Sequence, residues 1–140
     1  MTRTQEARTA ADAGESQRAL TIADLFGVWQ LVEIREFFSD GAARRSRSEV
    51  TGYLTYDAEG TASLVLGSTD RLLLDAGAFE IGADDSTISH EFDAAFHPEW
   101  PAVPFVARAH VVDNTLTLRS NPCVLSDGRT LLIRLEWSRL

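Results

Sequence analysis

The chain contains no lysine: all 13 of its basic residues are arginine, against 21 aspartates and glutamates, and its formal net charge is −8 at pH 7. An acidic protein repels the phosphates of nucleic acids and the headgroups of anionic membranes unless its basic residues gather in a patch. The one arginine cluster in the sequence, at 44–47, is too short for that and is expected to be a solvated loop. We therefore expect neither nucleic acid nor a membrane as a partner.

Cysteine and long apolar runs are also scarce. Cys123 is the only cysteine, so no disulfide can form within the chain, and a reducing compartment fits best. No run approaches the roughly 20 apolar residues that cross a bilayer, and the N-terminus lacks the apolar core of a signal peptide. We expect a cytoplasmic protein. Arginine without lysine, together with abundant alanine, is typical of a GC-rich genome and indicates a bacterial source.

Large apolar residues are nearly absent from 1–18, which consists mostly of Thr, Ala, Glu, Gln and Arg. Such a segment has little to bury against the entropy cost of ordering. We expect a flexible tail over 1–18 and one domain over 19–140, which is long enough to form a core without a metal or a disulfide. Asp24 is a fair N-cap for a single helical turn over Leu25 and Phe26.

Short alternating apolar segments, divided by turn residues, are abundant. The clearest turn is Asp57–Gly60, a four-residue hairpin loop with glycine where a positive φ is needed. We expect a long loop over 40–48 and a proline-broken loop over 96–101. The expected strands are 28–38, 50–56, 61–66, 78–81, 87–93, 105–112, 115–119 and 130–137, with 71–74 either a strand or part of a lid. Eight antiparallel strands can close on themselves, so the sequence predicts an all-β, eight-stranded antiparallel up-and-down barrel behind a short helical turn.

The opening Gly27-Val28-Trp29 and the motifs that follow it in order resemble those of the lipocalin-like domain family, stand-alone β-barrel proteins of bacteria and fungi. The motifs are Leu25-x-Gly27-x-Trp29, Asp40-Gly41, Gly52-x-Leu54-x-Tyr56-Asp57-x-x-Gly60, Gly77 with Phe79, Thr87-x-x-His90, Trp100, Arg108, Leu116-Thr117-Leu118 and Trp137-x-Arg139. The resemblance covers essentially the whole chain after the tail. It implies a calycin-type barrel, a fold that hosts carriers, isomerases and natural-product cyclases.

The chain departs from the pattern of that family at Asp75, where an aromatic residue is usual, and at Glu33 and Val106. These departures favour a specialised interior. Trp29 is expected at the closed end of the barrel, stacked under Arg139 or Arg134, because a guanidinium and an indole face attract each other.

His90 is the first candidate for chemistry. Alternation over 87–93 puts Ile88, His90 and Phe92 on one side of the strand and polar residues on the other, so His90 is expected to point into the barrel. An inward histidine is either a hydrogen-bonded core residue or a general acid or base.

Two charged residues have alternative placements. If Trp29 faces inward, continuous alternation carries Glu33 along the same wall, where it is either paired with an arginine such as Arg108 or an acid–base group with a raised pKa. Alternation within 105–112 places Arg108 outward, whereas the family resemblance favours an inward Arg108 that reaches a carboxylate or an anionic ligand.

Tyr56 is expected either to pack at the rim or to offer its phenol to a substrate carbonyl. No spacing of His, Cys, Asp or Glu predicts a metal site, and the sequence has no glycine-rich phosphate loop or nucleophile motif, so neither a metal nor a cofactor is expected. The predicted catalytic residues are His90, Glu33, Arg108 and Tyr56. The predicted ligand-binding residues are Trp29, Leu31, Leu54, Leu64, Phe79, Ile88, Phe92, Trp100, Leu118 and Trp137.

Together these features predict a cofactor-independent enzyme that binds a hydrophobic small molecule inside the barrel, as a cyclase or isomerase of bacterial secondary metabolism of the polyketide type. The alternative is a non-catalytic carrier, or a sequestering resistance protein, for an apolar ligand. The ionisable residues assigned to the interior favour the enzyme. We expect a monomer or a homodimer.

Overall fold

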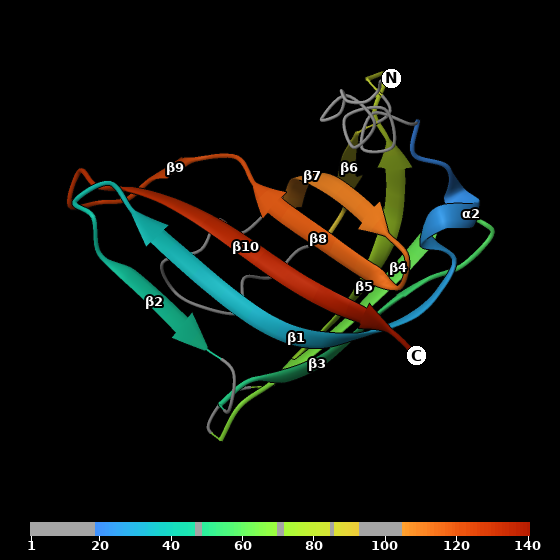
Figure 1. Ribbon diagram of the computed structural model, residues 1–140, viewed down its shortest axis with the longest axis horizontal. Coiled ribbons are helices and arrows are strands. Elements are labelled where there is room, and N and C mark those ends of the chain that lie inside the picture. Colours follow the sequence, from blue (N-terminus) through green and yellow to red (C-terminus); the bar gives the residue numbers. More distant parts are fainter. Residues whose placement is uncertain (1–18, 47–48, 70–71, 85, 93–104) are drawn as a thin grey trace, which may run out of the picture.

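The computed structural model describes residues 19–46, 49–69, 72–84, 86–92 and 105–140. The predicted tail over 1–18 and the predicted loop over 96–101 lie outside these ranges. The elements are α2 (Ile22–Leu25), β1 (Gly27–Phe38), β2 (Ala43–Ser46), β3 (Thr51–Tyr56), β4 (Thr61–Gly67), β5 (Leu72–Ile81), β6 (Thr87–His90), β7 (Phe105–Val112), β8 (Thr115–Ser120), β9 (Cys123–Val124) and β10 (Thr130–Arg139), shown in Figure 1.

Eight of the strands close into a barrel. Neighbours pair antiparallel in the order β1-β3-β4-β5-β6-β7-β8-β10, and β10 pairs back to β1. The short strands β2 and β9 are additions, on β1 and β10 respectively. In Figure 1, β1, β10 and β8 run side by side across the front, and β3 to β6 form the opposite wall. The predicted eight-stranded antiparallel barrel is confirmed.

Three predicted boundaries are wrong. The expected loop over 40–48 contains β2, which extends a hairpin from β1. The separate segments 71–74 and 78–81 form one continuous strand, β5, because Asp75, Ala76 and Gly77 stay paired to β4. The strand expected over 87–93 ends at His90.

Glycine at position 77 explains how the chain leaves β6. A Cβ added there would collide with the carbonyl oxygen of Glu91. The backbone N–H of Glu91 also donates a hydrogen bond of 2.9 Å to the carbonyl of Ala78. The segment after β6 therefore crosses close over β5, and only glycine leaves room for it.

A capping box begins α2. The N-cap is Thr21, one turn before the predicted Asp24: the Asp24 N–H donates to Thr21 Oγ1 over 3.3 Å, and the Thr21 N–H donates to Asp24 Oδ2 over 2.9 Å. Asp24 is thus the third helical residue, where a carboxylate closes the reciprocal pair.

Trp29 holds α2 against one end of the barrel. Its indole N–H donates to the carbonyl of Leu25 over 2.8 Å, and the guanidinium of Arg139 lies 4.1 Å above its ring. Arg139 also donates to the carbonyls of Phe26 and Asp24 over 2.7 and 2.8 Å. The predicted stacking of Trp29 under a C-terminal arginine is confirmed, with Arg139 in that role.

Side chains that alternate inward along the strands line the interior of the barrel and form its core. The largest fully buried apolar ones are Trp29, Trp137, Tyr56, Leu25, Leu54, Leu66, Ile88, Leu116, Leu118, Leu131 and Ile133. No helix within the described ranges has the length and apolar character needed to cross a membrane.

Candidate functional site

Tyr56 and His90 meet inside the barrel. Tyr56 is the last residue of β3 and His90 is the last of β6, and both are buried. The distance between Tyr56 Oη and His90 Nε2 is 2.6 Å. The expectation that His90 points inward is confirmed. Tyr56 is fully buried against it, at the end of β3.

Two phenylalanines enclose this pair. The Phe79 ring meets the Tyr56 ring edge-on at 4.8 Å, and the Phe92 ring stacks on His90 at 5.2 Å. Phe79 and His90 are directly opposed between β5 and β6. The aromatic walls fix the orientation of both polar side chains and keep water from them, which strengthens the hydrogen bond between them.

Burial determines the protonation state of Tyr56. Desolvation raises the pKa of its phenol well above the usual range, because the interior disfavours the phenolate. The phenol therefore stays protonated, and it can donate a hydrogen bond to His90 Nε2 in the tautomer whose proton is on Nδ1. The pair is then a proton donor and a proton acceptor in direct contact.

Glu33 does not lie on the inner wall. The register of β1 against β10 shifts between Leu31 and Glu33. Before the shift Leu31 is opposite the buried Trp137, whereas after it Glu33 is opposite Glu136, on the face that points away from Trp137, where its neighbours leave it only 8% exposed. A β-bulge of this kind inserts one residue and inverts the alternation that follows. The inner position predicted for Glu33 is therefore wrong, whereas the predicted pairing with an arginine is confirmed, because Arg35 lies 3.2 Å from its carboxylate.

Glu36 is the carboxylate that the bulge turns inward. It is opposite the buried Ile133 of β10 and is itself only 6% exposed. Its Oε1 lies 3.1 Å from Nε of Arg44, the residue opposite it on β2, and the two side chains form an ion pair. The sequence offered no sign of Glu36, because its orientation depends on an insertion that the alternating pattern does not reveal.

Asp75 is a second inward carboxylate. Along β5, its neighbours on the inward-facing side are the buried Leu73 and the partly buried Gly77. Across the strand pair, Asp75 is opposite Leu64 of β4. It is partly exposed. The sequence marked it as a departure from a family pattern, but it was not among the predicted site residues.

Arg108 lies on the outside of the barrel. Its neighbours Ala107 and Ala109 are buried, whereas Arg108 is exposed and donates to Ser86 Oγ over 3.1 Å. Of the two placements considered, the outward one from simple alternation is correct. Arg108 is therefore not a catalytic residue of the interior.

Most of the predicted wall does line the interior. The buried members are Trp29, Leu54, Phe79, Ile88, Phe92, Leu118 and Trp137, and Leu31 and Leu64 are partly buried against them. Trp100 lies outside the described residues. Trp29 is committed to the contacts with Leu25 and Arg139 described above, so its role at this end is structural.

Trp137 has a feature that its burial alone does not explain. Its side chain is 1% exposed, and its indole N–H has no hydrogen-bond partner among the residues that the structure describes. A buried donor without an acceptor costs about 1–3 kcal/mol. Such a group is a ready donor for an acceptor atom that enters the barrel.

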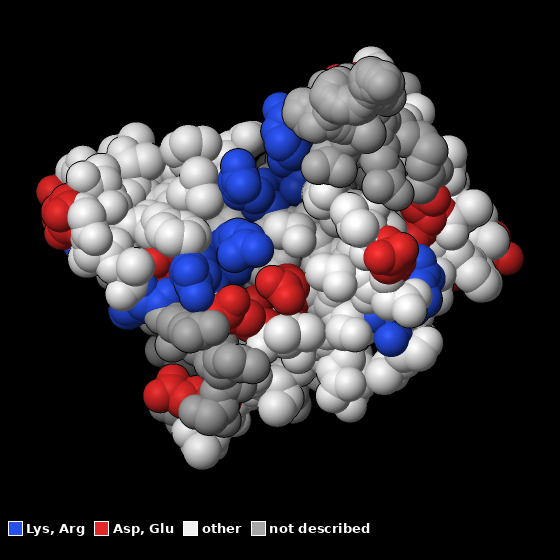
Figure 2. Space-filling model, viewed as in Figure 1, with Lys and Arg blue, Asp and Glu red and all other residues white. Residues whose placement is uncertain are grey.

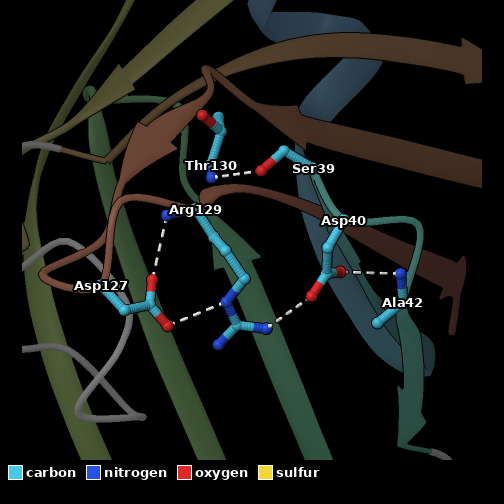
Figure 3. A network of polar contacts seen from close by, with 6 residues as sticks. All are labelled: Ser39, Asp40, Ala42, Asp127, Arg129 and Thr130. Carbon is cyan, nitrogen blue, oxygen red and sulfur yellow. Dashed lines mark hydrogen bonds and ion pairs between the residues drawn. The ribbon is translucent and has the colours of Figure 1, made fainter.

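The opposite end of β1 is held by the network in Figure 3. Arg129 donates to Asp127 Oδ2 over 2.9 Å and lies 3.5 Å from Asp40 Oδ2, so it joins the β9–β10 turn to the β1–β2 turn. The Thr130 N–H adds a bond of 2.9 Å to Ser39 Oγ. Hydrogen bonds from the backbone and side chain of Arg129 lower the pKa of Asp127.

Phe38 lies between two arginines at this same end. The guanidinium carbons of Arg129 and Arg44 are 4.5 and 4.9 Å from the centre of its ring. Since Arg44 also pairs with Glu36, the inward carboxylate is tied to the same cluster. In the described part of the chain, no three His, Cys, Asp or Glu side chains are grouped so that they could hold a metal ion.

Comparison with known proteins gives no further guide to this site: a scan against models of protein families and a search of curated proteins each found no match to the chain.

Proposed function

We propose that this protein is a cofactor-independent enzyme that binds a hydrophobic small molecule inside its barrel and catalyses a cyclisation or an isomerisation, as a member of the lipocalin-like family in bacterial secondary metabolism. The observation that carries the proposal is the 2.6 Å contact between Tyr56 Oη and His90 Nε2 in an apolar interior. A proton donor and a proton acceptor held in contact and away from water are what acid–base catalysis requires.

The pair supports a complete proton cycle on a carbonyl compound. With the ligand in place, the Tyr56 phenol turns its hydrogen bond from His90 Nε2 to the carbonyl oxygen, which makes Nε2 available as a base. His90 Nε2 then takes a proton from the carbon next to the carbonyl, and the phenol, which keeps its proton, stabilises the enolate by a hydrogen bond. The proton on His90 is finally given to the γ-carbon, which shifts the double bond, or to the alkoxide formed when the enolate carbon adds to a second carbonyl and closes a ring, so both side chains return to their starting state.

Trp137 and the aromatic walls supply the positioning. The buried N–H of Trp137 has no acceptor in the described residues, so it is suited to hold an oxygen of the ligand. Phe79 and Phe92 enclose the reacting pair. An apolar wall that holds a flexible chain in a near-reactive shape can itself remove several kcal/mol from a barrier.

A carrier is the second candidate, and one observation favours it. Tyr56 and His90 satisfy each other, and they are 1% and 0% exposed. A pair buried in this way also serves as a structural contact in a barrel that only sequesters an apolar ligand. In that case the ligand leaves the protein chemically unchanged.

Two variants and one control separate these functions. The test reaction is the isomerisation of a hydrophobic β,γ-unsaturated ketone, followed by the absorbance of the conjugated product. Tyr56→Phe and His90→Gln each remove one group of the reacting pair and should lower turnover by about two to four orders of magnitude. Tyr53→Phe is the matched control, because Tyr53 is on the same strand but 43% exposed. Equal turnover in all three variants would overturn the proposal.

A further inference from the structure

Four arginines form a straight row across the outside of the barrel. Register pairs Arg108 of β7 with Arg119 of β8, Arg119 with Arg134 of β10, and Arg134 with Arg35 of β1. We call these four residues the arginine row. At about 4.8 Å between strands, it is roughly 14 Å long.

Figure 2 shows this arrangement as a diagonal band of blue atoms over β8, β10 and β1. The expectation that the basic residues form no patch took account only of the 44–47 cluster. Sheet pairing brings together arginines that are up to 99 positions apart in the sequence, from position 35 to position 134. On this face the positive charge is segregated, although the whole chain carries −8.

The row is only partly neutralised. Arg35 pairs with Glu33 at 3.2 Å and Arg134 with Glu136 at 3.6 Å. Arg108 donates to the uncharged Ser86 hydroxyl, and within the described ranges the Arg119 side chain makes no hydrogen bond or ion pair. Like charges that are directly opposed on neighbouring strands destabilise a sheet. Each opposed pair of arginines in the row therefore lowers the stability of the sheet. An anionic ligand that binds the row best explains why these pairs are present.

The two sides of the row differ. On one side the next cross-strand set contains Thr117, Glu136 and Glu33. On the other side it contains Leu132, Phe37 and Ala43, and the Phe37 side chain is 37% exposed. A complementary surface therefore has a line of negative groups with apolar groups along one side of it.

We propose that the arginine row binds an acidic amphipathic helix of a partner protein, laid across the strands with its apolar side against Phe37 and Leu132. Side chains recur along one face of a helix with each 5.4 Å turn, close to the strand spacing of the row. In an extended peptide the same-face spacing is about 6.8 Å, twice the rise per residue, which fits the row less well.

The apolar side distinguishes this partner from a nucleic acid. A phosphate backbone offers a line of charge but no apolar surface at the matching place, and a long polyanion would meet the acidic remainder of the protein. A helical stretch of about 10 residues spans the row. The proposal does not depend on the reaction inside the barrel.

The test uses a labelled helical peptide of about 14 residues with glutamates on one face and leucines beside them. Fluorescence anisotropy measures its binding to the full chain at low and at high salt. The variant Arg119→Gln/Arg134→Gln should weaken binding about tenfold, since it removes two solvent-accessible charge pairs, each of modest strength. Arg3→Gln/Arg8→Gln makes the same change in net charge outside the row and should leave binding nearly unchanged.

Two further measurements make the result specific. Phe37→Ser should weaken binding of the leucine-bearing peptide, but not that of a peptide with alanine in place of leucine. Far-UV circular dichroism and the melting temperature verify that each variant is folded. The proposal is overturned if the peptide does not bind, if the two double variants bind it equally, or if single-stranded DNA or polyphosphate binds the row more tightly than the peptide.

Discussion

The guanidinium of Arg139, the second-to-last residue, stacks 4.1 Å above the indole of Trp29, near the start of the first strand. This contact joins the two ends of the barrel domain, since β1 and β10 are neighbours. Arg139 also bonds the carbonyls of Asp24 and Phe26, so it anchors the helical turn as well. The pair is a structural clamp at the end of the barrel opposite Phe38.

Removing the aromatic half of this clamp should be costly. Trp29→Ala empties a large buried site and is expected to lower the free energy of unfolding by about 3–5 kcal/mol. Arg139→Met keeps much of the side-chain volume but loses the cation and its hydrogen bonds, so a smaller loss is expected. Urea denaturation of both variants measures the two values. A loss for Trp29→Ala below that for Arg139→Met would contradict this account.

Trp29 and Trp137, which are both buried, should respond differently to loss of the indole N–H. Trp29 donates to the Leu25 carbonyl, and Trp29→Phe leaves that buried acceptor unpaired. Trp137→Phe breaks no hydrogen bond with a described residue. We therefore expect the larger drop in melting temperature for Trp29→Phe.

Ligand binding should show the reverse order. If the Trp137 N–H holds an oxygen of the ligand, Trp137→Phe should weaken the binding of a fluorescent hydrophobic ketone about tenfold, the value of one hydrogen bond. Trp29→Phe should bind the ketone nearly as well as the parent protein while it remains folded. Equal affinities for the ketone in Trp137→Phe and the parent would remove Trp137 from the binding site.

The arginine row should make the protein sensitive to salt. Because Arg119 is opposite an arginine on both sides, Arg119→Thr is expected to raise the free energy of unfolding by about 0.2–1 kcal/mol at low ionic strength. Screening should remove most of the gain at high salt. Thermal melts at two salt concentrations check this, and a destabilised Arg119→Thr would show that the opposed arginines do not repel.

Two turn carboxylates should affect stability in acid. Hydrogen bonds from the Arg129 backbone lower the pKa of Asp127, and those from the Ser86 backbone lower the pKa of Asp84. A carboxyl whose pKa is lower in the folded state stabilises the protein above its unfolded pKa, and that contribution is lost as the pH falls through the folded pKa. The free energy of unfolding should thus decrease below about pH 4, near the unfolded value.

The double variant Asp84→Asn/Asp127→Asn tests this assignment. Asparagine keeps the acceptor oxygen in each turn but cannot titrate. The decrease in unfolding free energy between about pH 5 and pH 3 should therefore be smaller in the variant than in the parent. An identical decrease in both proteins would assign the acid sensitivity to other groups.

Local patterns in the sequence predicted much of the fold. The hairpin at Asp57–Gly60, the inward orientation of His90 and the clamp between Trp29 and Arg139 all follow from alternation, turn chemistry and the attraction of a cation for an indole face. Each of these depends on residues within one strand or on the closure of the barrel ends. The sequence contains that information directly.

The remaining features depend on the pairing of distant strands. The bulge after Leu31 moves Glu33 outward and Glu36 inward, and nothing in the alternation of β1 reveals it. The contact between Tyr56 and His90 joins residues 34 positions apart. This contact can be predicted only when the positions of β3 and β6 in the closed barrel are known.

The central claim is that the interior performs chemistry on its ligand, and a single-turnover experiment tests it most directly. The protein is mixed in excess with a linear hydrophobic β-keto thioester or with the β,γ-unsaturated ketone, and the extract is analysed by mass and retention time. Enolisation by His90 and Tyr56 predicts a product of changed retention time, cyclised or isomerised, that is absent with Tyr56→Phe. Quantitative recovery of the unchanged starting compounds from a protein shown to bind them would contradict the account and leave a carrier.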